Sequence, residues 1–134
     1  RKGKATLLIF YLGKGCPHCM EQLNEFAPAN SKFQNAGIDI IAVSTDSPDG
    51  LAETFAINEE GKSQFPFPLI SDSNLMTFKK YRAFDDFENQ PLHGTFLIDQ
   101  EGRIRWQDIG FEPFMYSDWL LEECTRLLRM NPST

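Results

Sequence analysis

Two cysteines in the spacing C-x-x-C are the residues of this sequence best suited to chemistry. Only Pro17 and His18 separate Cys16 from Cys19. The nucleophilic form of cysteine is the thiolate, and a helix N-terminus favours such a charge through its unpaired N–H groups and its dipole. A C-x-x-C pair that follows a strand and begins a helix therefore predicts a redox dithiol, which opens and closes as a disulfide.

The residues around the pair predict that strand and that helix. Residues 7–12 form a short apolar run that a turn at Gly13 ends, which is typical of a buried strand. A helix is expected to follow, with Pro17 in its first turn, where the N–H that proline lacks is not needed. Pro28 is expected to kink this helix, and Gly37 is expected to end it.

The middle of the chain continues to alternate between strand and helix patterns. Residues 38–43 predict a second buried strand, and Ser47 before Pro48 predicts the start of a second helix. Further along, the patterns predict a short strand at residues 69–70, a helix that Asp72 caps and that ends near Tyr81, and a loop over residues 82–92.

The last part of the chain predicts a hairpin and a helix. Residues 95–99 and 103–107 resemble strands and flank a turn at Gly102. A last helix is expected over about residues 117–130, with Cys124 on its apolar face. The whole order predicts an α/β fold of three layers, in which helices cover both faces of a central mixed β-sheet.

Length, charge and cysteine number limit the class of protein. The 134 residues, 41% of them hydrophobic, suffice for one core, so we expect a single domain over residues 1–134. Because the chain opens on Arg1, we expect this domain to be excised from a longer protein. A net charge of −6 argues against nucleic acid or an anionic membrane as the main partner. No apolar run approaches the roughly 18–20 residues of a transmembrane helix, and three cysteines are too few for a disulfide scaffold.

The order of elements, with C-x-x-C at the first strand–helix junction, resembles the thioredoxin superfamily over nearly the whole chain. Within it, the sequence is similar to the AhpC/TSA–redoxin branch, which includes peroxiredoxins and TlpA-like thiol–disulfide oxidoreductases. The segments that carry this resemblance are residues 2–4, 7–10, 16–19, 43–48, 67–72 and 94–99 with Gly102. The resemblance implies a thioredoxin-like fold, with Cys16 as the attacking thiolate and Cys19 as the resolving cysteine.

The sequence departs from both families at the residues that support the cysteines. Thioredoxins and TlpA-like proteins carry a cis-proline before the hairpin strand, where this chain has His93 and Gly94, and the nearest proline is Pro91. Peroxiredoxins carry an arginine at the position of His93. Their Pro-x-x-x-Thr/Ser-x-x-Cys signature has a proline where this chain has Ile9 and a threonine or serine where it has Gly13.

Pro17 and His18, which lie between the cysteines, resemble the corresponding two residues of strongly oxidising DsbA-like proteins. A thiolate held by a helix N-terminus stabilises the reduced form, so the disulfide becomes a better oxidant. His18 is expected to tune the thiol pair rather than to act as a base, and Pro17 to start the helix. The Pro-His pair and the resemblance to TlpA-like proteins slightly favour a compartment outside the bacterial cytoplasm, whereas the resemblance to peroxiredoxins implies the cytoplasm.

Several neighbouring positions have two interpretations. His93 either contacts the thiolate or a peroxide in place of the arginine, or is a loop histidine without a role. Tyr11 and Lys14 are the nearest polar replacements for the peroxiredoxin threonine. Phe10 occupies the position of the buried thioredoxin aspartate, so no local carboxylate relays protons. The acidic residues after the pair, Glu21 and Glu25, are expected on a solvated helix face.

Two non-redox explanations of the C-x-x-C pair are disfavoured. A structural zinc ion needs four ligands, and apart from the pair only Cys124, His93 and His18 remain, so no metal or other cofactor is expected. An inert structural disulfide is disfavoured because a helix N-terminus enhances thiol reactivity. Cys124 itself is expected to be a buried core thiol, the less favoured alternative being a distant resolving cysteine.

Three hypotheses for the function remain. The leading one is a thiol–disulfide oxidoreductase that exchanges with protein thiols or disulfides, or with a reducing partner protein, through Cys16 and Cys19. The second is a peroxiredoxin-like thiol peroxidase, in which peroxide oxidises Cys16 and Cys19 resolves the product. The third is a non-enzymatic thioredoxin-like module. Aromatic residues that either line a docking groove or pack in the core are Phe84, Phe87, Phe111, Phe114, Tyr116 and Trp119.

Overall fold

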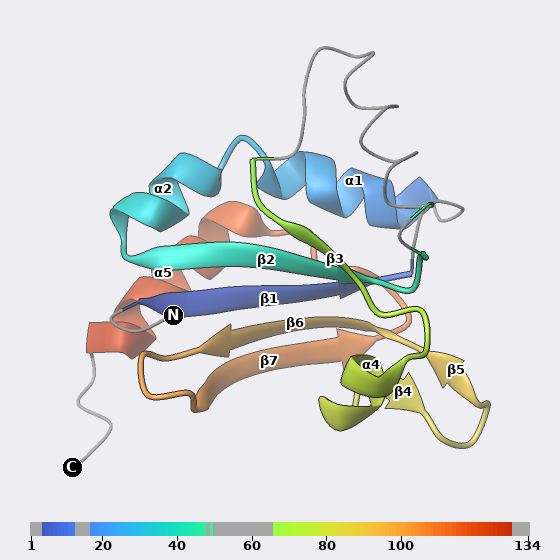
Figure 1. Ribbon diagram of the computed structural model, residues 1–134. Coiled ribbons are helices and arrows are strands. Elements are labelled where there is room, and N and C mark those ends of the chain that lie inside the picture. The colour runs from blue at the N-terminus through green and yellow to red at the C-terminus, as the bar shows by residue number, and fades with distance from the viewer. Residues whose placement is uncertain (1–3, 13–16, 48, 50–65, 130–134) are drawn as a thin grey trace.

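A five-stranded mixed sheet forms the centre of the molecule (Figure 1). The computed structural model describes residues 4–12, 17–47, 49 and 66–129, with the backbone alone for residues 17–20. The sheet has the spatial order β3-β2-β1-β6-β7 and consists of β1 (Ala5–Tyr11), β2 (Ile38–Ser44), β3 (Leu69–Ser71), β6 (His93–Ile98) and β7 (Ile104–Gly110). The first three strands run parallel, whereas β6 is antiparallel to both β1 and β7. The predicted strands and the predicted hairpin are therefore confirmed.

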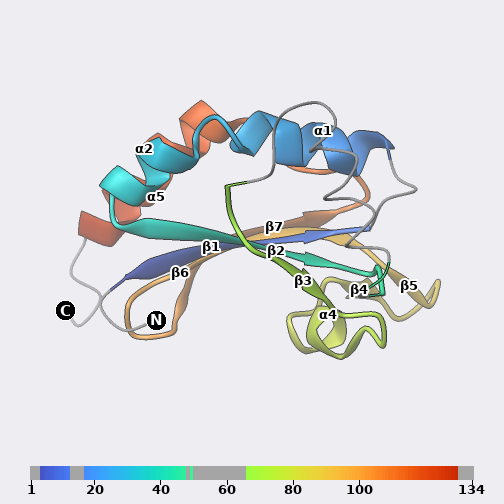
Figure 2. The ribbon, with the colours of Figure 1, turned by 45° about the horizontal axis from the view of Figure 1, so that its top comes forward.

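Helices cover both faces of this sheet (Figure 2). One face carries α1 (Pro17–Phe26), α2 (Asn30–Asn35) and α5 (Ser117–Arg129), and the other face carries α4 (Met76–Lys80). This arrangement confirms the predicted three-layer α/β fold. Within the described residues, no helix is long and apolar enough to cross a membrane.

The strand β1 is buried on both of its sides because it lies in the middle of the sheet. Its side chains alternate, so Leu7 and Tyr11 join the core beneath α1, α2 and α5, whereas Leu8 and Phe10 join the core beside α4. There the rings of Phe10 and Phe78 meet edge to face, with 4.9 Å between their centroids. Burial on two sides explains why this strand is a continuous apolar run in the sequence.

The expected kink at Pro28 is a full break between two helices. The helix α1 ends at Phe26, and α2 begins at Asn30. Proline has no N–H to donate to the preceding turn, so the helical ladder stops there. The prediction for the end of the helical region is confirmed, because Gly37 follows α2 with a φ of +81°, a conformation that glycine adopts without strain.

The prediction of a loop over residues 82–92 is wrong. This segment contains two short strands, β4 (Phe84–Asp85) and β5 (Gln90–Pro91), which pair antiparallel in a separate sheet. The Asp85 carboxylate closes the turn between them by accepting the backbone N–H groups of Phe87 and Glu88 at 3.0 and 3.1 Å. Strands of two residues are too short to show the alternation by which strands are recognised in a sequence.

The helix expected after Asp72 is present, but Asp72 does not occupy the capping position. That position belongs to Leu75, whose φ is 64°. The Asp72 carboxylate nevertheless accepts the backbone N–H of Phe78 at 2.9 Å, so it satisfies one of the N–H groups that a helix start leaves unpaired. The helix predicted to begin at Ser47 and Pro48 lies almost entirely outside the described residues.

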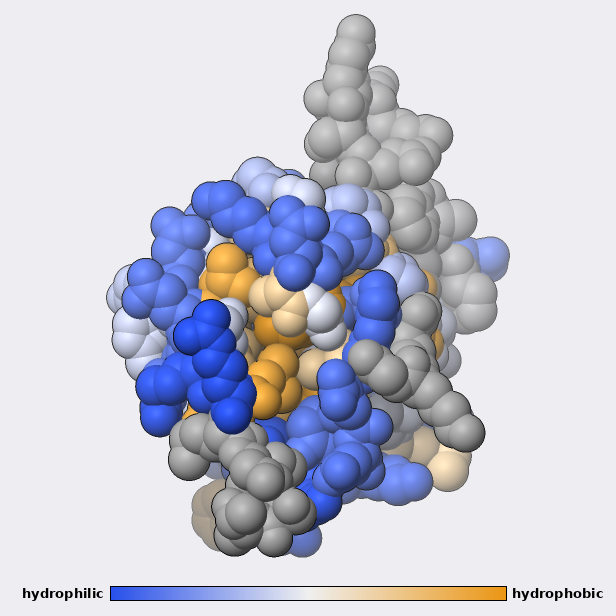
Figure 3. Space-filling view, turned by 90° about the vertical axis from the view of Figure 1, so that its left-hand side faces the viewer, coloured by the Kyte–Doolittle hydropathy of each residue, from blue (hydrophilic) through white to orange (hydrophobic). Residues whose placement is uncertain are grey.

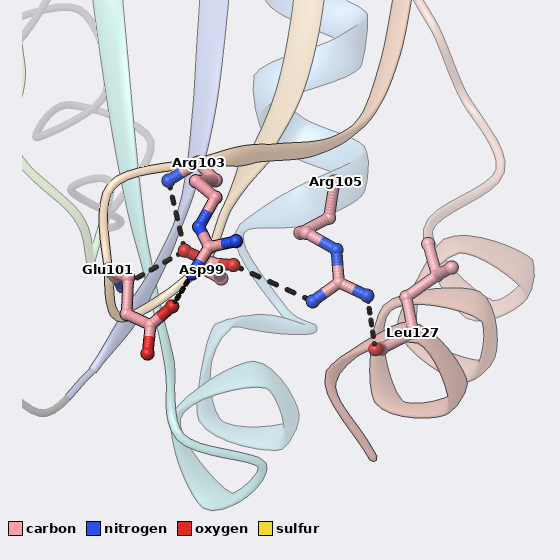
Figure 4. Close-up of polar contacts among 5 residues, drawn as sticks. All are labelled: Asp99, Glu101, Arg103, Arg105 and Leu127. Atoms are coloured by element: carbon pink, nitrogen blue, oxygen red, sulfur yellow. Dashed lines mark hydrogen bonds and ion pairs between the residues drawn. The ribbon is translucent and has the colours of Figure 1, made fainter. Parts of the chain in front are cut away.

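A polar cluster ties the β6–β7 hairpin to the end of α5 (Figure 4). Asp99 accepts the backbone N–H groups of Glu101 and Arg103 at 2.9 Å each, which closes the turn that contains Gly102. Arg105 lies 3.6 Å from the Asp99 carboxylate and donates a hydrogen bond of 3.1 Å to the carbonyl of Leu127. One arginine therefore joins the hairpin to the carbonyl end of the last helix, where a cation is favoured.

The end of the molecule at which β1 and β2 begin is hollowed (Figure 3). Apolar side chains occupy the centre of this view, and hydrophilic side chains surround them. A hollow of about 370 Å³ lies here, lined by Ala5, Ala36, Gly37, Gln100, Thr125, Leu128 and Arg129. It lies at the opposite end of β1 from the C-x-x-C segment, so it takes no part in the predicted redox site.

Candidate functional site

The predicted site lies where β1 ends and α1 begins. The strand ends at Tyr11, and the helix begins with Pro17, which confirms that this proline lies in the first turn. The backbone of His18 and Cys19 belongs to the same turn, whereas Cys16 lies outside the described residues. The α1 helix has ten residues, long enough to carry a positive dipole end at this position.

The two other predicted site residues lie on the neighbouring strand β6. Gly94 is opposite Phe10 in the antiparallel register, which puts His93 at the level of Tyr11, at the same end of the sheet as the start of α1. His93 pairs with Gly110 of β7 and is only 4% exposed. It is therefore a buried strand residue, and the interpretation of His93 as a loop histidine is wrong.

Gly94 has a structural reason to be glycine. A Cβ atom at this position would lie 2.9 Å from Cε1 of Phe96 and 3.2 Å from Cβ of Ala83. The first of these distances is too short for two carbon atoms, so a larger residue would displace its neighbours. Within the described residues no peptide bond is cis, and Pro91 lies in β5 rather than beside Gly94.

Tyr11 is oriented into the core rather than toward the end of the strand. The side chain is fully buried beneath the helices, and its hydroxyl accepts and donates no hydrogen bond within the described residues. Burial raises the pKa of Tyr11 to about 12, the side chain of Ser44 opposes this, and the charge of Asp46 adds to it. The phenol is therefore protonated at neutral pH. Lys14, the other predicted replacement for the threonine, lies outside the described residues.

Phe10 is packed on the opposite face of the sheet, against α4. Its ring lies 4.9, 5.4 and 5.6 Å from the rings of Phe78, Tyr81 and Phe96, measured between centroids. This aromatic packing occupies the position at which thioredoxins carry the aspartate.

Gln22 is a buried polar residue of α1 that the sequence did not single out. Its Nε2 donates to the Thr95 hydroxyl at 3.3 Å and to the carbonyl of Phe114 at 3.0 Å. The side chain is fully buried, and its Oε1 accepts no hydrogen bond within the described residues. These bonds join the helix that carries Cys19 both to β6 and to the segment before α5. A single glutamine in a helix, between Glu21 and Leu23, does not indicate in one sequence that its side chain joins distant elements.

The third cysteine is buried, as predicted. Cys124 lies on α5 with no exposed surface, among the residues of the core beneath the helices. Burial, followed by the neighbouring charge of Glu123, raises the pKa of Cys124 from 9.0 to about 12. The thiol is therefore protonated at neutral pH and shielded from solvent, which argues against the alternative of a distant resolving cysteine.

The acidic residues after the C-x-x-C pair are exposed, as predicted. Glu21 and Glu25 both lie on the solvated face of α1. Glu25 accepts a hydrogen bond of 2.9 Å from the hydroxyl of Ser117, the first residue of α5. Together with the Gln22 bonds, this contact fixes the start of α5 beside α1.

The predicted aromatic residues fall into two groups. Phe84 and Phe87 belong to the β4–β5 hairpin, on the α4 side of the sheet. The others lie in the segment after β7 and in the first turn of α5, where the Phe114 ring contacts the rings of Trp106, Tyr116 and Trp119 at centroid distances of 5.2, 5.6 and 5.9 Å. The second group adjoins α1 through the bond from Gln22 to the Phe114 carbonyl.

Comparison with known proteins agrees with this arrangement. The model of the AhpC/TSA family matches residues 1–107. A curated peroxiredoxin of Thermoplasma volcanium is 29% identical over 106 residues, which are 78% of this chain and 52% of the relative. A chloroplastic peroxiredoxin Q of Sedum lineare is 30% identical over 105 residues, which are 78% of this chain and 54% of the relative. The chain thus spans about half the length of these relatives.

Solved structures of peroxiredoxins share the fold. A mitochondrial 2-Cys peroxiredoxin from Plasmodium falciparum superposes with a TM-score of 0.78 at 26% identity, covering 94% of this chain and 76% of that one. Enterococcus faecalis AhpC superposes with a TM-score of 0.81 at 19% identity, and the match covers 93% of this chain and 75% of that one. Xanthomonas campestris peroxiredoxin Q superposes with a TM-score of 0.77 at 24% identity, and the match covers 93% of this chain and 80% of that one.

Proposed function

Because the chain belongs to the AhpC/TSA family of thioredoxin-like redox proteins, we propose that it is a thiol peroxidase that uses Cys16 and Cys19. The family match over residues 1–107 is the observation that carries this proposal, since the curated relatives are peroxiredoxins. The comparisons thus favour the second of the three hypotheses drawn from the sequence over the first.

The proposed reaction has two steps on the protein. The Cys16 thiolate attacks one oxygen of a peroxide, the O–O bond breaks, and the second oxygen leaves with a proton as water or an alcohol. The resulting Cys16 sulfenic acid is then attacked by the Cys19 sulfur, which forms the disulfide and releases the hydroxyl group as water. A dithiol reductant supplies two electrons and two protons to restore both thiols.

The start of α1 and the start of β6 support this chemistry. The N-terminus of a ten-residue helix favours the thiolate over the thiol by its dipole. We infer that the buried imidazole of His93 donates an N–H to the thiolate or to the peroxide, in the role that the arginine has in peroxiredoxins. Its burial at the level of Tyr11 agrees with this role, because a hydrogen bond is stronger where water is excluded.

Stopped-flow kinetics with hydrogen peroxide test the proposal. We expect the reduced protein to react at least about tenfold faster than free cysteine at pH 7, since more of its thiol is ionised. Cys16→Ser should abolish the reaction, whereas Cys19→Ser should leave a sulfenic acid that dimedone traps. A rate no faster than that of free cysteine would overturn the proposal.

A second candidate function is thiol–disulfide exchange with proteins. It is favoured by the C-x-x-C spacing and by the residues Ile9, Gly13 and His93, which replace the proline, threonine and arginine of the peroxiredoxins. Insulin reduction that needs both cysteines, together with mixed disulfides trapped by Cys19→Ser, would support it. The redox potential of the pair against glutathione gives the direction of exchange.

A further inference from the structure

Gln22 is a buried amide that joins three elements of the fold. It lies on α1, one helical turn after Cys19, and its side chain has no exposed surface. Its Nε2 donates to the hydroxyl of Thr95 on β6 at 3.3 Å and to the carbonyl of Phe114, in the segment before α5, at 3.0 Å. A carbonyl only accepts hydrogen bonds, so the nitrogen of the amide must face Phe114, and this determines the orientation of the side chain.

The amide specifies where α1 lies on the sheet more strictly than apolar packing does. Leu23 and Phe26 hold α1 against the core, but hydrophobic contact has no preferred direction. A hydrogen bond depends on both distance and angle, and Gln22 makes two of them to different elements. Its Oε1 is buried and accepts no hydrogen bond within the described residues, so the amide is held there at a cost in free energy. The two bonds therefore fix the position of α1 relative to β6.

The bond to Thr95 is made on the face of β6 that also carries His93. Side chains alternate along a strand, and the pairing of β6 with β7 is regular from His93 to Leu97, so His93, Thr95 and Leu97 share one face. Leu97 belongs to the core beneath the helices, and Gln22 reaches Thr95 from α1. His93 therefore faces the layer that contains α1.

Short lengths of both elements separate this bond from the residues of the proposed redox site. The helix α1 and the strand β6 both start at the end of the sheet where β1 ends (Figure 1). From Gln22 back to Cys19 the helix rises by about 4.5 Å. From Thr95 back to His93 the strand extends by about 7 Å in the same direction. The bond between Gln22 and Thr95 therefore sets how the first turn of α1 is placed relative to His93.

We propose that Gln22 is a positioning residue for the peroxidase reaction: its amide holds the first turn of α1 where the Cys16 thiolate and the His93 imidazole act on the same peroxide. This role rests on the proposed function and adds a requirement to it, because two groups on different elements must keep a fixed separation. Thr95 is the acceptor on β6 through which Gln22 acts. A displacement of about 1 Å can lower the rate of a reaction that needs two placed groups about 100-fold.

Two reactions of Cys16 separate its positioning from its ionisation. All proteins carry Cys19→Ser, so that Cys16 and the buried Cys124 are the only thiols. Iodoacetamide reports the thiolate alone, because the sulfur displaces iodide without help from a second group, whereas hydrogen peroxide also needs the hydrogen-bond donor. We expect Gln22→Met to lower the rate constant with peroxide at least about tenfold, and to leave the rate of alkylation and its pH profile within about twofold.

Matched variants separate the hydrogen bond from a general loss of stability. Thr95→Val removes the acceptor at nearly the same shape and should lower the peroxide rate, whereas Thr95→Ser keeps the hydroxyl and should keep the parent rate. This pair decides alone if circular dichroism shows that Gln22→Met does not fold. Ile38→Val destabilises the same core at the opposite end of the sheet and should change neither rate. Addition of Gln22→Met to His93→Leu should cause no further loss, because Gln22 acts through the position of the imidazole.

Three results would overturn the positioning role. They are a peroxide rate that Gln22→Met leaves unchanged or lowers only together with the alkylation rate, equal peroxide rates in Thr95→Val and Thr95→Ser, and losses from Gln22→Met and His93→Leu that multiply in the double variant. Failure of the proposed function is seen separately, in the parent protein, as a peroxide rate no faster than that of free cysteine. That result would remove the positioning role as well, whereas a fast parent rate with any of the three results would remove the positioning role alone.

Discussion

Gly94 allows β6 to pass close to the aromatic side chains next to it. Replacement by alanine would put a methyl group 2.9 Å from the buried Phe96 ring. We expect Gly94→Ala to lower the free energy of unfolding by about 1–3 kcal/mol, as overpacking of a core does. Urea denaturation at pH 7 measures this change.

Gly110 of the adjacent strand is the matched control for that substitution. Apart from its two neighbours in the chain, no atom of the described residues lies within 4 Å of a Cβ placed there, and its φ is not in the left-handed region. Gly110→Ala should therefore change the stability by less than about 0.5 kcal/mol. Equal effects of the two substitutions would show that the contact with Phe96 does not determine the need for glycine at position 94.

Cys124 should be chemically inert in the folded protein. In a Cys16→Ser, Cys19→Ser background it is the only remaining thiol, and burial with a pKa of about 12 keeps it protonated and inaccessible. Mass spectrometry should show iodoacetamide labelling at pH 8 at least about a hundredfold slower than that of free cysteine, and fast labelling in urea. Labelling of the folded protein at the rate of free cysteine would contradict the burial.

At the scale of elements, the Asp99–Arg105 cluster makes the hairpin sensitive to acid. Burial raises the pKa of Asp99, but the N–H groups of Arg103 and Glu101 and the charges of Arg103 and Arg105 lower it further, so the net shift is downward. A carboxyl group with a lowered pKa in the folded state stabilises that state above its unfolded pKa, which is about 3.9. This stabilisation is lost as the pH falls through the folded pKa.

Asp99→Asn should therefore destabilise the protein more at pH 7 than at pH 3. We expect a loss of about 1–3 kcal/mol at pH 7, because the partly buried Arg105 loses its charged partner. Urea denaturation at both pH values gives the comparison, and Asp86→Asn on an exposed turn serves as the control. A loss of stability that is the same at both values would contradict the role of the ionised carboxylate.

The longer elements could be predicted from the sequence because each has its own local signal. The apolar runs of β1 and β2, Pro17 at the start of α1 and Gly102 in the hairpin each indicate structure without reference to distant residues. The short β4 and β5 carry no such signal, because side-chain bonds from Asp85 form their turn. Gln22 could not be found for a related reason, since its partners Thr95 and Phe114 are distant in the sequence. The cysteine pair was evident from spacing alone, but its substrate was not.

At the scale of the whole molecule, two buried groups in one core make the fold sensitive to alkali. Tyr11 and Cys124 lie in the core beneath α1, α2 and α5, and burial raises the pKa of each to about 12. A group whose pKa is raised by folding stabilises the protein below its unfolded pKa, about 8.5 for cysteine and 10 for tyrosine. This stabilisation begins to fall as the pH rises above the unfolded pKa values and is lost by the folded ones, so unfolding becomes easier above about pH 9.

Tyr11→Phe and Cys124→Ala should each reduce the loss of stability between pH 8 and pH 11. Tyr11→Phe should also cost little at pH 7, because the hydroxyl is buried without a hydrogen bond in the described part of the chain. Tyr116→Phe, at an exposed position, should leave the pH profile unchanged. Thermal unfolding across this pH range measures all three, and parallel profiles for wild type and both core variants would contradict the prediction.

The position of α5 determines where this domain can be joined to a foreign sequence in a chimera. The region shared with the family model stops at residue 107, within β7, yet α5 inserts Leu120 and Cys124 into the core that also contains β1. Arg105, on the shared side of that boundary, is anchored to Leu127 on the other side. A chimera that joins a foreign sequence after residue 107 would therefore uncover the part of the sheet that α5 covers, and a workable junction must come after α5.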